Sequence, residues 1–146
     1  MSEPDICWRV CREIYADLRG LGGVYMAQRW NHKGQAVVYA AEHPALAAYE
    51  VLATQNFIGP DDSIEKQVLL EIDLSAVTGS IETAPPFDRE DKMESRDYGT
   101  AWLQENRTVL LRVASVRVPR STNILINPSH PRAEELSFEI HAFSFR

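Results

Sequence analysis

Apolar residues divide the chain into short segments with two kinds of spacing. Runs of about four to eight apolar residues bounded by turn residues are typical of strands, and apolar residues three or four positions apart are typical of helices. The runs predict strands at residues 5–10, 35–40, 67–74, 108–116, 123–127 and 137–145. The helical spacing predicts helices at residues 11–19, about 44–54 and about 100–106. Because strands and helices do not alternate regularly, this order predicts a strand-rich α/β or α+β domain and disfavours a doubly wound sheet.

Glycines, prolines and charges indicate the connections between these elements. Residues 20–23 contain three glycines, which are expected to end the first helix and open a loop. Residues 24–31 run into a turn at Gly34, which favours a hairpin with residues 35–40. Residues 79–98 hold two prolines and many charges with little periodicity, so a long exposed loop is expected there.

The last predicted strand changes register near its end. Phe138 and Ile140 alternate with polar residues as a strand requires, but Phe143 and Phe145 fall on the other face. A shift of this kind favours a β-bulge between the two pairs.

The composition is that of an ordinary globular protein. The chain has 146 residues and a mass of 16.5 kDa, which favours one domain spanning residues 1–146. The net charge of -6 disfavours direct nucleic-acid binding, because that binding depends on clustered positive charge. No apolar run approaches the roughly 18 residues of a membrane span, and the first twenty residues lack the apolar core of a secretory signal. The chain is therefore expected to be cytoplasmic and not bound to a membrane.

The common signatures of metal and nucleotide sites do not occur in the sequence. There is no G-x-G-x-x-G and no G-x-x-x-x-G-K-[ST] segment. The four histidines form no i, i+4 pair, and no further ligands stand near Cys7 and Cys11, so no metal site is expected and both cysteines are expected to be free thiols. No G-x-S-x-G elbow surrounds Ser115, which disfavours a Ser-His-Asp triad.

Glu50 is the only charged residue between Pro44 and Pro60. Pro44 suits the first turn of the helix expected there, because its missing N–H costs nothing at that position. At helical spacing both faces beside Glu50 are apolar, so the helix is expected to be largely buried. An ionised carboxylate removed from water costs several kcal/mol unless it is paired. We therefore expect Glu50 to serve a structural ion pair or a functional site, with Arg9 and Arg29 as candidate partners.

Other side chains suit either ligand binding or ordinary packing. Arg29 stands between a glutamine and Trp30-Asn31 before a glycine turn, where its planar guanidinium can bind phosphate or carboxylate. Trp30 can stack on a base or a nicotinamide ring, or pack in the core. Tyr39 is expected in the core with its hydroxyl at a rim, and Ser115 ends an apolar strand where its hydroxyl can bind phosphate or sugar.

Taken in order, these residues resemble the RES-domain toxin family. The resemblance runs from about residue 6 to residue 146, and its most specific parts are QRWNHKG at 28–34 and NILINPSHP at 123–131. The family takes its name from an arginine, a glutamate and a serine, which Arg29, Glu50 and Ser115 match in this chain.

The resemblance implies an α+β fold similar to that of ADP-ribosyltransferases, with central mixed or antiparallel sheets and a few short helices in a single RES domain. It implies the toxin of a type II toxin–antitoxin system, with NAD as substrate and no metal. The implied partner is an antitoxin with a helix-turn-helix domain of the Xre type that blocks the NAD pocket. Family members either cleave NAD by hydrolysis or phosphorolysis, or transfer ADP-ribose to a protein such as phosphoribosyl-pyrophosphate synthetase, and both activities stay open here.

The chain departs from the family pattern at two places. Ala27-Gln28 stands where two glycines are common, and Ala114 stands where proline is common. The first departure keeps a third alternative open, namely a non-catalytic interaction module with a vestigial pocket.

The resemblance also implies a role for each site residue. Cleavage of the nicotinamide–ribose bond passes through an oxocarbenium-like transition state, and one carboxylate can offset its positive charge. That role falls to Glu50, while Arg9 and Arg29 would hold the pyrophosphate, Tyr39 would pack on nicotinamide or ribose, and Ser115 would bind a phosphate or the ribose. The expected catalytic residues are Glu50, Arg29 and Tyr39, and the expected NAD-binding residues are Arg9, Arg29, Trp30, Tyr39, Ser115 and Asn123.

Overall fold

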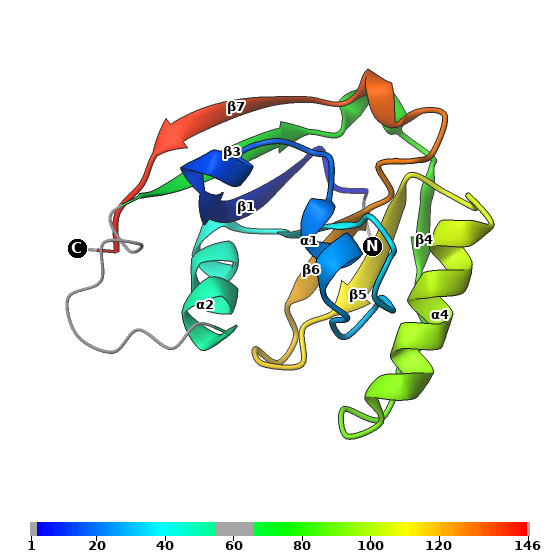
Figure 1. Ribbon diagram of the computed structural model, residues 1–146. Helices are drawn as coiled ribbons and strands as arrows, with labels where there is room; N and C mark the ends of the chain where they lie inside the picture. The colour runs from blue at the N-terminus through cyan, green and yellow to red at the C-terminus, as the bar shows by residue number, and fades with distance from the viewer. Residues whose placement is uncertain (1–2, 55–65, 146) are drawn as a thin grey trace.

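A single mixed sheet forms the centre of the computed structural model, which describes residues 3–54 and 66–145 (Figure 1). The strand order is β4-β5-β6-β2-β1-β3-β7, and neighbouring strands are antiparallel except for β4 and β5, which are parallel. The strands are β1 (Ile6–Arg12), β2 (Val38–Ala41), β3 (Gln67–Asp73), β4 (Ile81–Thr83), β5 (Leu110–Ala114), β6 (Thr122–Ile126) and β7 (Ser137–Ala142). The helices are α1 (Leu21–Tyr25), α2 (Pro44–Thr54) and α4 (Lys92–Gln104), with short 3-10 turns η1 (Glu13–Tyr15), η2 (Ser75–Val77) and η3 (Ala133–Glu135). A mixed sheet with a few helices confirms the predicted α+β class.

The sheet divides into two halves where β1 meets β2. These strands pair at one position, Trp8 with Ala41, whereas β1 pairs with β3 along its whole length. Figure 1 shows the consequence, because β1, β3 and β7 cross the view while β5 and β6 run down it. Beyond that pair the two strands diverge, and α2 packs against both of them through Leu46 and Ala47.

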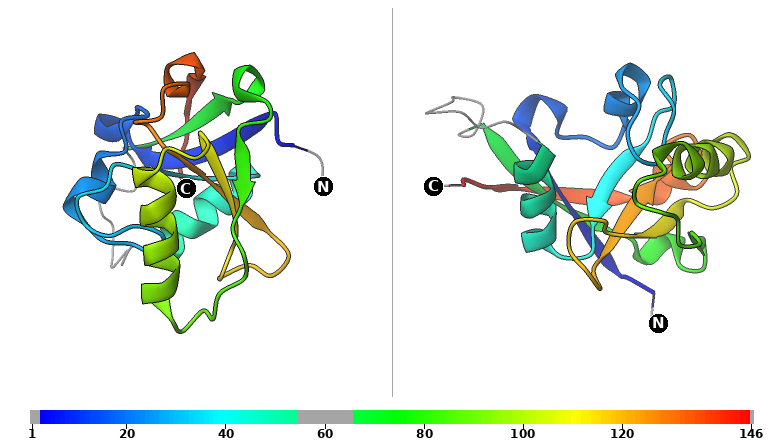
Figure 2. Two further views of the ribbon diagram at one scale, coloured as in Figure 1. Left: turned by 90° about the vertical axis from the view of Figure 1, so that its right-hand side faces the viewer. Right: turned by 90° about the horizontal axis from the view of Figure 1, so that it is seen from below.

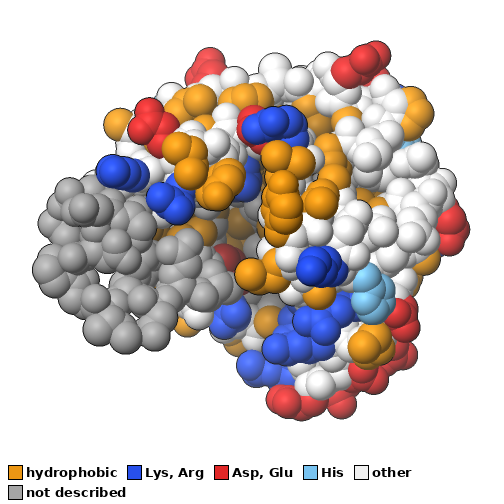
Figure 3. Space-filling model, viewed as in Figure 1, with side chains coloured by type: hydrophobic (Ala, Val, Ile, Leu, Met, Phe, Trp, Pro, Cys, Tyr) orange, Lys and Arg blue, Asp and Glu red, His pale blue; other side chains and the backbone are white. Residues whose placement is uncertain are grey.

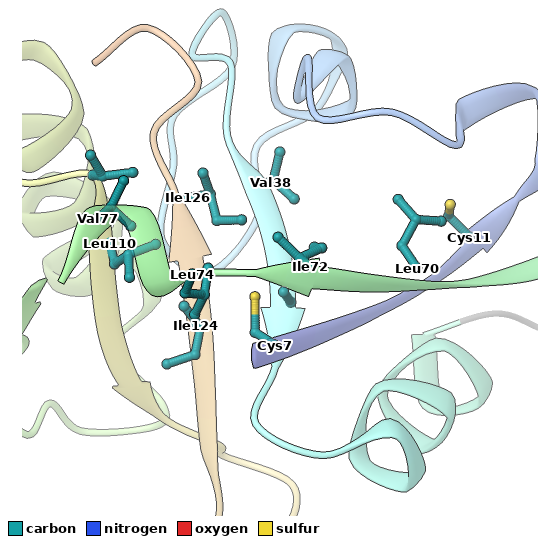
Figure 4. Packing of buried hydrophobic residues seen from close by; sticks show 12 residues of the cluster. Cys7, Cys11, Val38, Leu70, Ile72, Leu74, Val77, Leu110, Ile124 and Ile126 are labelled. Atoms are coloured by element: carbon teal, nitrogen blue, oxygen red, sulfur yellow. The ribbon is translucent and has the colours of Figure 1, made fainter. Parts of the chain in front are cut away.

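Three groups of buried apolar side chains hold these elements together. The largest lies between the two halves of the sheet and includes Leu70 and Ile72 from β3 (Figure 4). A second group packs α4 onto β5 and β6, with Trp102 fully buried at its centre. Figure 2 shows α4 and α2 as separate helices on different parts of the sheet. Each fully buried large side chain contributes about 1.5–3 kcal/mol relative to its exposed state.

The start of the chain differs from the sequence prediction. Residues 11–19 do not form a helix, because Cys11 continues β1 opposite Val68 and only η1 follows. Ile14, on which the helical spacing depended, is 67% exposed. The glycines at 20–23 do not open a loop, since Gly20 adopts a left-handed conformation that starts α1.

The expected hairpin across Gly34 is also absent from the described residues. Residues 24–31 form no strand, and the pairing there is a single bridge between Gln28 and Asn31 that closes a tight loop.

Two predictions for the second half of the chain were also wrong. Residues 79–98 are not one exposed loop, because they contain β4 and the first two turns of α4, which begins where Asp91 accepts a hydrogen bond from Glu94 N. The last strand has no bulge, since β7 pairs with β3 at every position from 137 to 142. Phe143 and Phe145 lie beyond the strand, where their rings pack edge to face.

The predicted helix at 44–54 is confirmed at both ends, but its burial is not. Leu46 and Ala47 are buried, whereas Tyr49 and Leu52 are 49% and 42% exposed. The helix therefore buries one face, and the apolar stretch that follows it in the sequence lies outside the described residues. In the described part of the chain, no helix has the length and apolar character of a membrane span.

Candidate functional site

Two adjoining cavities meet at Glu50, and the first of them opens where β1 and β2 diverge. The first, about 360 Å³, is lined by β1 from Trp8 to Arg12, by β2 and by α2, and we call it the β1 cavity. The second, about 540 Å³, is lined by Arg29, Lys92, Arg96 and Arg117 together with parts of β5 and β6, and we call it the basic cavity. Four side chains line both cavities and so mark the boundary between them: Gln28, Tyr39, Glu50 and Asn123.

Glu50 lies at this boundary, on the face of α2 that turns toward the sheet. Its Oε1 accepts hydrogen bonds from Ser115 Oγ at 2.7 Å and Asn123 Nδ2 at 3.4 Å. Its Oε2 lies 3.3 Å from Arg117 Nε. The side chain is 24% exposed, so the carboxylate is held by partners from β6 and from the loop between β5 and β6 without being sealed from water.

The ion pair of Glu50 differs from the one expected from the sequence. Arg117, which the sequence analysis did not single out, takes the place expected for Arg9 or Arg29. Arg9 lines the β1 cavity and donates from Nη1 to the carbonyls of Tyr15 and Asp17, each at 2.9 Å. Arg29 lines the basic cavity, so the two arginines expected to share a pyrophosphate line different cavities.

The hydroxyl of Ser115 makes its hydrogen bonds to other groups of the protein. Its hydroxyl donates to Glu50 and accepts hydrogen bonds from the main-chain N–H groups of Val118 at 3.1 Å and Arg117 at 3.3 Å. A hydroxyl has one proton and two lone pairs, so these three bonds use its whole capacity. A direct bond from Ser115 to a ligand would have to replace one of them.

Tyr39, which also lines both cavities, is held in place by a network of hydrogen bonds. Its hydroxyl accepts from Trp30 N at 3.1 Å and donates to Asn31 Oδ1 at 2.6 Å. Asn31 is fully buried, and its amide donates to the carbonyls of Gly23, Met26 and His32. Burial raises the pKa of the Tyr39 phenol, so it stays protonated and its ring forms a fixed wall.

Asn123 carries an unpaired acceptor at the same boundary. Its Nδ2 donates to Glu50, but its Oδ1 is buried and has no hydrogen-bond partner among the described residues. A buried acceptor without a partner costs free energy, and it is a place where a ligand N–H or O–H can bind.

The basic cavity gathers cations that are distant in the sequence. Arg29 donates to the carbonyl of Arg89 at 3.1 Å, and Arg96 donates to the carbonyl of Gln28 at 2.6 Å. Burial lowers the pKa of Arg29, and the nearby charges of Arg117, Arg89 and Arg96 lower it further. Figure 3 shows Lys and Arg side chains gathered on this face between α2 and α4. Although the chain is acidic overall, this cavity suits an anionic ligand.

Trp30 is mainly a core residue. It is 6% exposed, and its ring packs against Phe87 and Tyr98 at centroid distances of 5.7 and 6.3 Å. Little of its surface can stack on a ligand, although it contributes to the wall of the basic cavity. In the NILINPSHP segment, Asn127 is also structural, since its buried amide donates to the carbonyl of Leu103 and to Asn106 Oδ1.

A cluster of side chains that could bind a metal ion lies away from the two cavities. Across the described ranges, the one cluster of three such side chains is Glu71, Glu139 and His141 on β3 and β7. Cys7 and Cys11 are free and buried, and burial raises the pKa of both thiols. The cluster lines neither cavity, whereas Cys11 lines the β1 cavity, where its raised pKa keeps it a protonated thiol.

Comparisons with known proteins connect this geometry to a family. A model of the RES domain matches residues 6–146. A protein of Pseudomonas putida KT2440 named Toxin Res is 34% identical over 142 residues, covering 95% of each chain. A Sphingobium sp. YBL2 protein named Prs ADP-ribosylating toxin is 38% identical over 139 residues, covering 87% of this chain and 84% of its own. The M. tuberculosis MbcT-MbcA toxin-antitoxin complex contains a chain with a similar fold, with a TM-score of 0.74 and 16% identity over 96% of this chain and 84% of that one.

Proposed function

The chain belongs to the RES domain family, and from this premise we propose that it is the toxin of a toxin–antitoxin pair and cleaves NAD between nicotinamide and ribose. The observation that carries the proposal is Glu50, a single carboxylate held at the boundary between the β1 cavity and the basic cavity. The acceptor of the ADP-ribose is water or phosphate.

The proposed reaction needs one carboxylate and no general acid. The C1′–N bond breaks with its electron pair moving to the pyridinium nitrogen, so nicotinamide leaves as a neutral molecule. Positive charge then develops on the ribose, as in other glycosyl transfers. A carboxylate that is already in place stabilises this charge without having to reorganise. Water or phosphate adds to C1′, and a proton is released to solvent.

The two cavities provide for the rest of the substrate. The cations of the basic cavity, Arg29, Lys92 and Arg96, suit a pyrophosphate with two negative charges. The fixed Tyr39 ring can pack on nicotinamide or ribose, and Asn123 Oδ1 can accept from a ribose hydroxyl or the carboxamide of nicotinamide. Arg9, from the β1 cavity, remains available to contact the other end of the molecule.

A second candidate function is ADP-ribose transfer to a protein. The relative named Prs ADP-ribosylating toxin, at 38% identity, favours it. The same carboxylate and cavities would act on NAD, and a nucleophile of the target protein would replace water or phosphate at C1′. The similarity to a chain of a toxin–antitoxin complex supports an antitoxin as partner, which we propose to carry an Xre-type helix-turn-helix domain and to cover the NAD pocket.

Nicotinamide release from NAD by the purified chain tests the proposal. Replacing Glu50→Gln keeps the size of the side chain and removes its charge, and we expect the rate to fall by about 100-fold or more. Glu134→Gln, at an exposed position in η3, is the matched control and should leave the rate unchanged. Equal rates for wild type and Glu50→Gln would refute the proposal.

The acceptor is identified by two further conditions. A rate that depends on added phosphate indicates phosphorolysis, and a rate independent of phosphate indicates hydrolysis. Labelled NAD mixed with cell lysate should give labelled protein bands only if ADP-ribose is transferred to a protein. No release and no labelled protein would favour the non-catalytic interaction module.

A further inference from the structure

The two oxygens of the Glu50 carboxylate are held from the same loop. Ser115, at the start of the loop between β5 and β6, donates to Oε1 at 2.7 Å. Arg117, two residues later, places Nε 3.3 Å from Oε2. One contact on each oxygen fixes the rotation of a carboxylate about its Cγ–Cδ bond, which a contact on one oxygen alone would leave loose.

This loop is built to hold its own shape. Its ends are joined by a bond from Ser115 N to the carbonyl of Ser121 at 2.9 Å, and Ser121 N donates to the carbonyl of Val118 at 3.3 Å. The main-chain N–H groups of Arg117 and Val118 both donate to the hydroxyl of Ser115. The backbone of Arg117 is therefore hydrogen-bonded to the serine that holds Glu50. This bond fixes the position from which the Arg117 side chain starts relative to the Ser115 hydroxyl. Figure 1 shows α2 beside this loop.

We propose that Arg117 is a positioning residue for Glu50, which aims the carboxylate at the boundary of the two cavities through its Nε–H. The proposal rests on the proposed function and adds a residue to it. The alternative role is direct binding of a substrate phosphate, since Arg117 also lines the basic cavity. The geometry favours positioning, because Nε faces Glu50 while Lys92, Arg29 and Arg96 supply cations to the same cavity.

The two roles give different kinetics. A residue that only binds the substrate phosphate changes KM with little effect on kcat, whereas a residue that orients the reacting carboxylate changes kcat. For Arg117→Gln we therefore expect kcat for nicotinamide release to fall by about tenfold or more, with KM for NAD changing less than about threefold. Arg117→Lys keeps the charge but replaces the planar guanidinium and its Nε–H with an ammonium on a flexible stem, so it should recover only part of kcat.

Arg120→Gln is the matched control. Arg120 lies in the same loop, is exposed, and lines neither cavity, so the variant removes the same charge without touching Glu50. Its kcat and KM should equal those of the wild type. Added guanidinium ion should restore part of kcat to Arg117→Ala and nothing to Glu50→Gln, a rescue that a merely structural role would not produce.

Each outcome decides a separate claim. An increase in KM with unchanged kcat in Arg117→Gln, or kinetics equal to those of Arg120→Gln, overturns the positioning role. Thermal unfolding of each variant shows whether the fold is intact. If Arg117→Gln does not fold, the positioning role is tested by the guanidinium rescue of Arg117→Ala and by the kinetics of Arg117→Lys. If the wild type itself neither releases nicotinamide nor labels protein, the proposed function fails, and the role of Arg117 in that reaction fails with it.

Discussion

Gly99, in the middle of α4, is where the helix touches the loop that carries Arg29. A Cβ added at this buried glycine would lie 1.8 Å from the carbonyl oxygen of Trp30. The same helix face holds the loop by two hydrogen bonds, from Ser95 Oγ to the carbonyl of Arg29 at 2.7 Å and from His32 N to Thr100 Oγ1 at 2.9 Å. Gly99→Ala should therefore disturb both the packing of α4 and the position of Arg29.

The size of the effect follows from two opposing contributions. Alanine in a helix interior is favoured over glycine by about 1 kcal/mol. Against this, the helix and the loop must separate by about 1.5 Å to reach ordinary contact, and overpacking of this kind costs about 1–3 kcal/mol. The two hydrogen bonds between α4 and the loop lengthen at the same time, at about 1 kcal/mol each. We expect a net loss of about 2–4 kcal/mol in the free energy of unfolding, which lowers the unfolding midpoint by about 2–4 °C for each kcal/mol.

Urea and thermal unfolding measure this loss against a matched glycine. Gly22, in α1, has nothing within 4 Å of an added Cβ, so Gly22→Ala should be neutral or slightly stabilising. If Gly99→Ala and Gly22→Ala unfold at the same midpoint, the close packing of Gly99 against the carbonyl of Trp30 is refuted. Below both midpoints, nicotinamide release should fall in Gly99→Ala alone, because Arg29 is displaced.

Two further predictions concern buried groups. Tyr39→Phe leaves Trp30 N–H and Asn31 Oδ1 without their shared partner, so the free energy of unfolding should fall by about 1–3 kcal/mol, and an unchanged urea midpoint would contradict the network. In a titration of the native protein followed at 295 nm, Tyr39 and Tyr98 should stay protonated at pH 11, because burial raises the pKa of both and that of Tyr98 to about 12. Ionisation of all five tyrosines near pH 10 would contradict this.

A third prediction concerns Cys7, whose pKa is also raised by burial. Burial raises the pKa of Cys7, so the unfolded thiol ionises first as the pH rises, and the free energy of unfolding falls above about pH 9. Iodoacetamide should label Cys7 slowly in the native protein and rapidly in urea, and equal rates would show that this thiol is not buried.

The sequence pattern was sufficient where the signal is local. The helix at 44–54 has apolar spacing and a proline at its start, and the strands at 67–73, 110–114 and 122–126 are apolar runs bounded by turn residues. Glu50 was found as the one charge in an apolar stretch. Such features need no knowledge of the rest of the chain, because residues close in sequence determine them.

The first turns of α4 could not be found in this way. Its buried face begins with Ser95 and Gly99 before the apolar Trp102 and Leu103, so the helical spacing is hidden by small residues. They are small because the main chain of Arg29 and Trp30 lies against them, more than sixty positions earlier in the sequence. Likewise, Cys11 joins β1 because its partner Val68 comes from β3.

By itself, then, the sequence determined the fold class, most of the strands, the helix of Glu50 and the family. The tertiary structure alone decided what surrounds that carboxylate. Arg117 lies in the loop between β5 and β6, and Arg96 lies in α4, whose first turns fall in a charged segment without helical spacing. The residues next to them in the sequence do not indicate that either one lines the site. The physical reason is that a site is made by contacts between distant segments, and how the whole sheet pairs decides which segments meet.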